Sequence, residues 1–326
     1  MSGSETTPSR RISVVTPVYN SEGTLGALVD RLEAVLKPLT NEFEIVLVND
    51  GSRDKSWQVI GELAKSHSSV VGIDLMRNYG QHNALLCGIL AARYEILITI
   101  DDDLQNPPEE ISVMLAELDR GADVVYGYPD KQQHGLLRAL ASEITKIVLQ
   151  NAMGAQTARR ISAFRAFHTN LRGAFTHYRG PFVSIDVLLT WGTSKFTAIQ
   201  VKHDSRSLGA SNYTVAKLIT HAMNMLTGFT TFPLQMASLG GFALTLVGIV
   251  LLLFVVGRYI FYGAAVQGFT FLASAISMFS GAQLFALGII GEYLARLHMR
   301  TMERPAYAVR QSTSTTVSSD HPNTNE

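Results

Sequence analysis

Three consecutive carboxylates give the strongest chemical signal in the sequence. Asp101, Asp102 and Asp103 lie between the apolar run 98–100 and the segment Leu104-Gln105-Asn106-Pro107-Pro108-Glu109. Clustered carboxylates repel one another, and placing them at the end of a buried strand is costly unless a cation joins them. Hard oxygen ligands with open positions for phosphate suit Mg²⁺ or Mn²⁺. The cluster therefore predicts a divalent metal site.

The geometry expected for this cluster depends on where the preceding strand ends. If the strand continues through it, Asp101 and Asp103 point to one side and Asp102 to the other, because side chains alternate along a strand. The competing interpretation is that the acidic residues only cap the helix that follows Pro107-Pro108. One carboxylate would suffice for capping, so three favour the metal.

Two further polar turns follow apolar runs. In Val48-Asn49-Asp50-Gly51-Ser52, Asp50 can accept hydrogen bonds from the edge of a nucleobase. Thr16-Pro17-Val18-Tyr19-Asn20 follows the first apolar run of the chain. Each turn is ambiguous by itself, because connections in any α/β protein contain such residues. No Gly-x-Gly-x-x-Gly follows the first run, which argues against a dinucleotide-binding dehydrogenase.

Basic residues form the third group. Arginine forks match phosphate oxygens, and a diphosphate leaving group together with a phosphate acceptor needs several cations. Arg165 stands out because its neighbours are apolar, and Arg206 because it lies in a segment rich in Gly and Ser. For any single arginine, a solvated surface charge is the simpler explanation. The candidates are Arg138, Arg159, Arg160, Arg165, His203 and Arg206.

These residues must be positioned by an alternation of short strands and longer helices. Such alternation predicts βαβ units on a mostly parallel sheet, in which ligands bind beyond the carboxyl ends of the strands. The strands are expected at residues 12–15, 44–49, 70–75, 94–100 and 124–126. The helices are expected at 24–39 and 55–67, and from Gln81 and Pro108 onward.

Two uncharged apolar stretches near the C-terminus, 237–256 and 269–290, indicate a membrane. Each is long enough to span a bilayer, which needs about 20 apolar residues. The connection 262–268 has no Lys or Arg, whereas Arg296, Arg300 and Arg304 follow the second stretch. The positive-inside rule then places both termini in the cytoplasm. The alternative is a helical hairpin buried in a soluble core.

Composition narrows the remaining classes of protein and of cellular compartment. The formal net charge of zero and the lack of a long basic run argue against nucleic-acid binding. The single cysteine, Cys87, has apolar neighbours, which favours a buried thiol in a reducing compartment. Residues 1–11 are polar and lack the apolar core of a signal peptide, so we expect no export of the first domain.

The two segments that flank the apolar stretches are polar or amphipathic. Residues 212–235 have apolar side chains at helical spacing beside Lys217 and His221, as in a helix that lies in the membrane interface, although core packing explains the pattern equally well. The chain after Arg310 is rich in Ser and Thr with few apolar residues, so we expect disorder there.

Taken in order, these motifs resemble the family 2 glycosyltransferases that make polyprenyl-phosphate sugars, the group that includes dolichol-phosphate mannose synthase. The resemblance covers about residues 12–306. It rests on the three polar turns described above, on His203-x-x-Arg206-x-x-Gly209-x-Ser211-x-Tyr213, on Gly228-Phe229-Thr230-Thr231-Phe232-Pro233-Leu234, and on the segment 288–296. Two positions depart from the usual pattern. Many relatives have Glu directly after the Asn of the first turn, where this chain has Ser21 and then Glu22, and many have Asp just before Phe-Arg, where this chain has Ala163.

The resemblance implies a GT-A domain, a nucleotide-sugar donor, a polyprenyl phosphate acceptor and Mg²⁺ or Mn²⁺ held by Asp101, Asp103 and Gln105. Because the acceptor phosphate is already an anion, it needs no general base, and a single displacement would invert the sugar carbon. Asp101, Asp103, Arg165 and Arg206 are expected to take part in catalysis. Expected donor contacts are Pro17, Tyr19, Asn20, Glu22, Asp50, Asn78, Asp101 and Asp102. Expected phosphate contacts are Arg138, Arg165, His203, Arg206, Ser211 and Tyr213.

The expected domain organisation has five parts: a flexible N-terminus (1–10), the GT-A domain (11–211), the interfacial amphipathic helix (212–235), two transmembrane helices (236–295) and a largely disordered cytoplasmic tail (296–326). The expected location is the cytoplasmic membrane, and the sequence leaves homo-oligomerisation open. Two other functions remain: a transferase with a glycan or protein acceptor, and a non-catalytic membrane partner of a lipid-sugar flippase.

Overall fold

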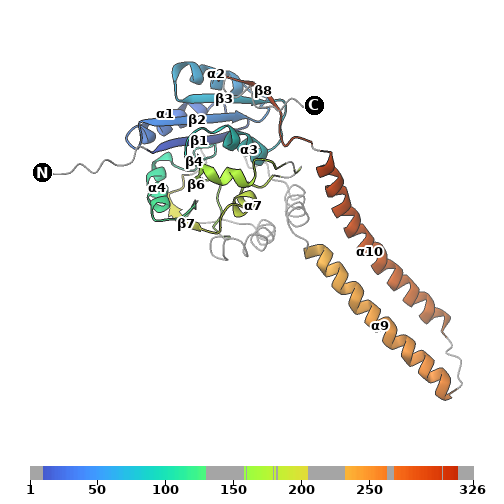
Figure 1. The fold of residues 1–326 in the computed structure, drawn as a ribbon. Helices are drawn as coiled ribbons and strands as arrows, with labels where there is room; N and C mark the ends of the chain where they lie inside the picture. Colours follow the sequence, from blue (N-terminus) through green and yellow to red (C-terminus); the bar gives the residue numbers. More distant parts are fainter. Residues whose placement is uncertain are drawn as a thin grey trace, which may run out of the picture. The chain divides into compact units, whose positions relative to one another are not determined.

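The computed structural model describes residues 10–129, 158, 160–178, 180, 183–204, 232–262, 268–302 and 304–314. These residues belong to two compact units, a soluble unit that includes both ends of the chain and a helical unit within 216–303. The soluble unit is built on one eight-stranded sheet with the strand order β7-β5-β6-β4-β1-β2-β3-β8 (Figure 1).

The strands of this sheet are mostly parallel, as the sequence predicts. β1, β2, β3 and β4 run in one direction, and β5 pairs in parallel with β7. Two strands are antiparallel to their neighbours: β6, between β4 and β5, and β8, at the edge beside β3. The strands are β1 (Arg11–Val18), β2 (Glu42–Asn49), β3 (Val70–Leu75), β4 (Ile96–Thr99), β5 (Val124–Pro129), β6 (Arg165–His168), β7 (Phe196–Val201) and β8 (Val309–Ser312).

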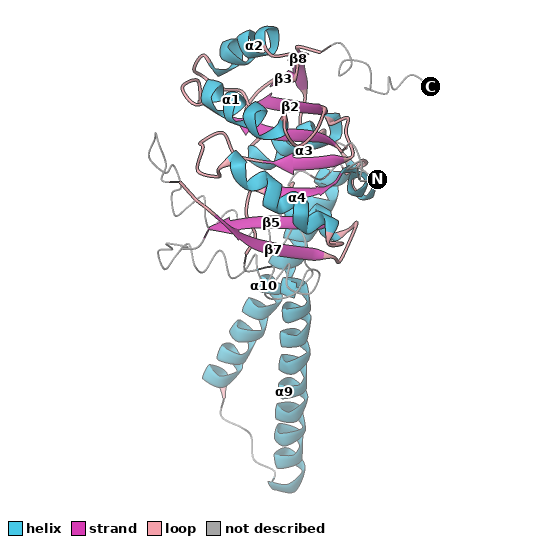
Figure 2. Ribbon diagram, turned by 90° about the vertical axis from the view of Figure 1, so that its left-hand side faces the viewer, coloured by secondary structure: helices cyan, strands magenta, loops and turns pink. Residues whose placement is uncertain are grey.

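Helices cover both faces of the sheet (Figure 2). Buried leucines of α1 and α4 belong to the same apolar cluster as Val14 and Leu47, on one face. α3 packs on the other face, because Gly88 lies against Val15 and Val48, the neighbours that alternate with those residues. The helices of the soluble unit are α1 (Leu25–Leu36), α2 (Ser56–Ser66), α3 (Gln81–Ala91), η1 (Pro108–Glu110), α4 (Ile111–Asp119), η2 (Thr169–Ala174) and α7 (Ile185–Thr190).

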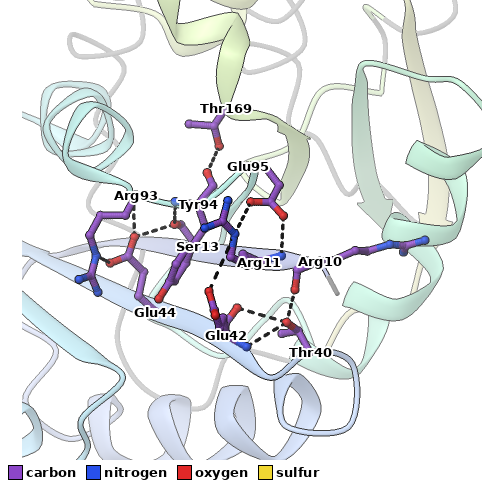
Figure 3. Close-up of polar contacts among 10 residues, drawn as sticks. All are labelled: Arg10, Arg11, Ser13, Thr40, Glu42, Glu44, Arg93, Tyr94, Glu95 and Thr169. Atoms are coloured by element: carbon purple, nitrogen blue, oxygen red, sulfur yellow. Dashed lines mark hydrogen bonds and ion pairs between the residues drawn. The ribbon is translucent and has the colours of Figure 1, made fainter. Parts of the chain in front are cut away.

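A buried carboxylate fastens the amino ends of the strands (Figure 3). Glu44 accepts a hydrogen bond from Ser13 Oγ at 2.7 Å and two from Arg93, from its backbone N and from Nε, both at 2.7 Å. Tyr94 N also donates to Ser13 Oγ at 3.1 Å. This network joins β1, β2 and the approach to β4 at the end of the sheet opposite to the polar turns.

The helical unit consists of α9 (Phe232–Tyr262) and α10 (Phe269–Thr301). Both predicted apolar stretches lie within these helices. The windows Pro233–Val250 and Met278–His298 are long and apolar enough to cross a membrane, and none of either window is buried in the protein. The alternative of a hairpin buried in a soluble core is therefore not supported. An apolar groove of about 910 Å³ runs between the two helices.

Three expectations about the elements need correction. β4 ends at Thr99, whereas the sequence predicts a strand through Ile100. β6 and β7 are two strands that the sequence does not predict, since no strand is expected after residue 126. The expected disorder after Arg310 is wrong for residues 311–314: β8 extends to Ser312, and Thr313 N donates to Gly72 O at 2.9 Å.

The cysteine behaves as expected. Cys87 is buried within α3, and burial raises the pKa of its thiol to about 12. Such a thiol stays protonated at neutral pH and is a structural side chain.

Candidate active site

The polar turns after β1, β2 and β4 meet at one edge of the sheet, and Asp102 connects two of them. Its Oδ2 accepts hydrogen bonds from Tyr19 N at 3.2 Å and Ser21 Oγ at 2.5 Å. Thr24 Oγ1 donates to the Asp102 carbonyl at 2.7 Å. Burial raises the pKa of Asp102, and the Ser21 hydrogen bond opposes that shift. Ser21, one of the two departures from the family pattern, therefore anchors the acidic turn.

Asp101 lies beside Asp102 but faces a different partner. Gln81 Nε2, at the start of α3, donates to Asp101 Oδ1 at 2.7 Å. Burial first, and then the charges of Asp103 and Asp102, raise the pKa of Asp101 to about 7. The charge of Arg165 lowers the pKa of Asp101 but does not offset burial and the neighbouring carboxylates, and a bound cation would relieve that remaining repulsion.

The acidic turn is not an extension of the strand. Leu104 has a positive φ of 60°, a conformation that non-glycine residues rarely adopt and that often occurs at functional sites. Asp103 Oδ1 accepts from Gln105 N at 3.2 Å, and Gln105 O accepts from Asp204 N at 2.9 Å. The alternation expected for a continued strand therefore does not apply to these three carboxylates.

The carboxylates do not form a closed metal site. Over the described part of the chain, no group of three or more His, Cys, Asp or Glu side chains is arranged to hold a metal ion by itself. Asp101 and Asp103 are partly buried and lie in the same turn. Mg²⁺ is often held in this way, by one or two carboxylates together with substrate phosphates and water.

Asp50 holds the loop that follows β3. Its carboxylate is only 3% exposed and accepts hydrogen bonds from Tyr79 N at 2.6 Å and Gly80 N at 2.8 Å. Burial raises the pKa of Asp50, and these two hydrogen bonds oppose that shift. The preceding residue, Asn49, donates from Nδ2 to buried Asp74 at 2.7 Å. Asp50 therefore positions backbone around the expected nucleotide site.

Asn20 and Glu22 also bond to the protein itself. Asn20, with a positive φ of 55°, donates from its backbone N to Ser52 Oγ at 3.0 Å and accepts from Arg53 N at 2.8 Å. Glu22 Oε2 accepts from Lys55 N at 2.8 Å. These contacts join the first turn to the turn after β2. Both side chains thus shape the wall of the site.

Three of the other expected donor contacts differ in their exposure. Pro17 is buried in β1, whereas Asn78 is exposed. Tyr19 is 43% exposed, which is unusual for a side chain of this size next to a buried strand. The exposed aromatic ring and the exposed amide are available to a ligand.

The side chain of Arg165 is engaged by the protein itself. It is 3% exposed, and Nε and Nη2 donate to the two oxygens of Asp186 at 2.8 and 3.0 Å. Nη1 donates to Thr99 Oγ1 at 3.3 Å and Ala163 O at 3.1 Å. Burial alone would raise the pKa of Asp186, but the charge and hydrogen bonds of Arg165 lower it. The fork that was expected to contact phosphate is thus occupied by a buried carboxylate.

The remaining phosphate candidates are only partly described. His203 is exposed just after β7, and the Arg160 guanidinium lies 4.8 Å from the centre of the Tyr128 ring. Arg138, Arg159, Arg206, Ser211 and Tyr213 lie outside the described residues, as does most of the predicted interfacial helix.

Several residues at this edge are not among the predicted site residues. Gln81 contacts Asp101, and Tyr126 Oη donates to Asp186 Oδ1 at 3.0 Å. Asp186 carries no local signal, because it lies in the ordinary segment Ile185-Asp186-Val187-Leu188. Gln81 could have been found from its place at the start of the predicted helix after β3, since that end of a parallel sheet carries the ligands.

Comparison with known proteins identifies the family. Residues 13–177 match the family described as Glycosyl transferase family 2. The chain belongs to glycosyltransferase family 2. The glycosyltransferase is 35% identical, over 308 residues, to an undecaprenyl-phosphate 4-deoxy-4-formamido-L-arabinose transferase of Pectobacterium carotovorum, and the match covers 94% of each chain. It is 36% identical to the protein of the same name from Pectobacterium atrosepticum, again over 94% of each chain.

Among solved structures, the glycosyltransferase resembles glucosyl-3-phosphoglycerate synthase from Mycobacterium tuberculosis in complex with Mn²⁺, UDP-glucose and phosphoglyceric acid, with a TM-score of 0.49 and 18% identity over 67% of this chain and 78% of that one. Family membership confirms the resemblance drawn from the motifs, and the enzymatic interpretation replaces that of a non-catalytic partner.

Proposed function

We propose that this family 2 glycosyltransferase moves a sugar from a nucleoside diphosphate sugar onto a polyprenyl phosphate at the cytoplasmic face of a membrane. The observation that carries the proposal is the extent of the match to the undecaprenyl-phosphate transferases. It covers 94% of the chain, and the remainder is shorter than either α9 or α10. The likeness therefore includes at least part of each apolar helix as well as the sheet.

The donor nucleotide would bind where the turns after β1, β2 and β3 meet. Exposed Tyr19 and Asn78 border this edge, and Asp50 fixes the backbone of residues 79–80 between them. The remaining lone pairs of the Asp50 carboxylate would accept from a base bound there, and Pro17, Asn20 and Glu22 support the same wall. The base itself is not specified by these contacts.

Mg²⁺ or Mn²⁺ would be held by Asp101, Asp103 and Gln105. The fit rests on the chemistry of the donor set: two crowded carboxylates, one with its pKa raised to about 7, and a neutral amide, all hard oxygen ligands. When bound, the ion would neutralise charge on the diphosphate as its bond to the sugar breaks. Gln81 would orient Asp101 through its 2.7 Å hydrogen bond.

No protein carboxylate needs to activate the acceptor, because a lipid phosphate is already an anion at neutral pH. Asp186 is a buried carboxylate of this region, and Arg165 donates hydrogen bonds to both of its oxygens and lowers the pKa of Asp186. These contacts fit a structural role for Asp186 better than the role of a base. Arg165 is therefore assigned to positioning the site in place of direct phosphate contact. Arg138, His203, Arg206, Ser211 and Tyr213 remain the candidates for binding the two phosphate groups.

The membrane helices would keep the site at the surface where the acceptor's phosphate lies, which restricts the search to two dimensions. Arg296, Arg300 and Arg304 follow the second span, and the connection 262–268 has no Lys or Arg. Both termini would accordingly face the cytoplasm.

The test is transfer of radiolabel from UDP-, GDP- and dTDP-sugars to an organic-extractable lipid, with purified protein, polyprenyl phosphate and Mg²⁺ or Mn²⁺. Donors that carry 4-deoxy-4-formamido-L-arabinose are the first to try, because the name of the relatives includes this sugar. We expect metal-dependent label from one donor, lost in Asp103→Ala and retained in Asp30→Ala, a change of an exposed aspartate on α1. Label that enters only water-soluble acceptors would favour a glycan or protein substrate and overturn the proposal.

A further inference from the structure

The chain that leaves the second apolar helix becomes part of the catalytic sheet. α10 ends at Thr301, and β8 begins at Val309. β8 pairs with β3 in antiparallel register, with Asp74 opposite Gln311 and a register shift next to Leu75. Beyond this shift, Met76 N donates to Ala308 O at 2.9 Å. Ala308, the residue before β8, therefore bonds to the first residue of the loop that follows β3.

Arg310, on β8, contacts this loop with its side chain. Nη2 donates to Met76 O at 2.8 Å, and Nε lies 3.7 Å from Asp74 Oδ2. Asp74 is buried and also accepts from Asn49 Nδ2 at 2.7 Å. One guanidinium therefore holds the end of β3, the start of the loop and, through Asp74, the end of β2.

The loop 76–80 is in turn packed against the Asp50 turn. Tyr79 N and Gly80 N donate to Asp50, as described above. Gly51 has a φ of +63°, and a Cβ atom at this position would lie 2.5 Å from Asn78 N and 2.6 Å from the Arg77 carbonyl carbon. Because the loop backbone leaves no room for even a Cβ atom at Gly51, a displacement of the loop toward this residue must disturb the turn.

We propose that Arg310 is a positioning residue for the donor site: it holds the loop 76–80 in the conformation that, with Asp50, receives the nucleoside diphosphate sugar. This inference rests on the proposed function for the identity of the ligand. It gives the segment after α10 a part in donor recognition. Arg310 acts through Met76 and Asp74 and has no direct contact with substrate.

The experiment compares full-length wild type, Arg310→Ala and Arg310→Lys with Arg11→Ala. Arg11 is a matched control, because its side chain is 51% exposed against 56% for Arg310, and it also pairs with carboxylates of the same unit, Glu42 on β2 and Glu95 just before β4. Two readouts are measured: hydrogen exchange of the amides at residues 76–80, and the KM and kcat for the donor that wild type uses.

In Arg310→Ala we expect faster exchange at Tyr79 and Gly80 and a donor KM raised about fivefold, the scale of one lost hydrogen bond. The kcat at saturating donor and the KM for polyprenyl phosphate should stay within twofold. Lys can replace one of the two contacts, so Arg310→Lys should lie between Ala and wild type. Arg11→Ala should leave both readouts unchanged.

Unchanged exchange at residues 76–80 together with an unchanged donor KM would overturn the inference. Faster exchange spread over β1, β2 and β3 alike would also overturn it, because Arg310 would then stabilise the sheet generally. If wild type transfers no sugar from any donor, the proposed function fails, and the exchange data still decide whether Arg310 holds the loop.

Discussion

The buried pair of Arg165 and Asp186 gives the sharpest prediction about the site, because two accounts of Arg165 differ in what its loss should do. If Arg165 contacts phosphate, Arg165→Met should reduce transfer and leave stability unchanged. If it is a structural partner of Asp186, the variant should unfold more easily. The structure favours the second account, since four hydrogen bonds to Asp186, Thr99 and Ala163 engage its guanidinium.

The magnitude follows from the burial of the carboxylate that would be left behind. Asp186 is 7% exposed, and removing its cation leaves an uncompensated buried charge, which costs about 3–5 kcal/mol. For a domain of this size, 1 kcal/mol shifts Tm by about 2–4 °C, so the expected drop is roughly 6–20 °C. Arg165→Met/Asp186→Leu removes both charges and should recover about half of the loss. The rest is the lost acceptor of Tyr126 Oη, which costs about 1–3 kcal/mol.

The assay is thermal unfolding of the purified full-length variants in detergent, followed by tryptophan fluorescence. Of the two tryptophans, Trp191 directly follows α7, the helix that carries Asp186, and Trp57 lies on α2, so a Trp57→Phe background makes the signal report on the Asp186 region. Arg120→Met, at an exposed pair with Glu117, is the matched control and should shift Tm by less than about 2 °C. Wild-type stability of Arg165→Met combined with loss of transfer would refute the structural account and restore the direct phosphate contact.

Three other changes test further parts of the account. Gly51→Ala places a Cβ against backbone in a left-handed turn, so we expect a cost of at least about 1–2 kcal/mol and a raised donor KM, measured by denaturant unfolding and steady-state kinetics. Gly88→Ala should also destabilise the protein, by about 1–3 kcal/mol, because the Cβ of the alanine would clash with Val15 Cγ1. It should leave the donor KM unchanged, since Gly88 lies in the core. A raised donor KM would contradict this separation of core from site. The pKa of Asp101 is raised to about 7. Between about pH 4 and that value, the folded, metal-free protein therefore binds more protons than the unfolded chain. Its stability should fall as the pH rises through this window. Asp101→Asn should lack this slope, and equal denaturant midpoint changes from pH 5 to pH 8 in both proteins would refute the assignment.

The alternating strands and helices of the first half of the fold could be predicted from the sequence, because β1 to β5 are dense apolar runs. The predicted range of β3 agrees with the structure, and the other predicted strands differ from it at their ends. β8 could not be predicted in this way, since its residues Val309-Arg310-Gln311-Ser312 carry almost no apolar pattern. What stabilises it is backbone pairing with the edge of β3 and the side chain of Arg310, and neither leaves a periodic signal.

The position of the site was predictable for a related reason. Asp50 directly follows β2, and Asp101 lies two residues after the end of β4. A parallel sheet therefore brings both residues to one edge. What those side chains contact was not predictable. The partner of Arg165 lies 21 residues further along the chain in an unremarkable segment, and the apolar neighbours of Arg165 indicate burial without naming the counter-ion.

The measurement that tests the central claim most directly is identification of both products of a single transfer reaction. If the enzyme transfers a sugar to polyprenyl phosphate, chromatography and mass spectrometry should find one nucleoside diphosphate released for each sugar-phosphate lipid formed. Release of nucleoside monophosphate with a diphosphate-linked lipid would mean that a phosphosugar is transferred instead. That result would contradict the proposal that the bond between the sugar and the diphosphate is the one that breaks.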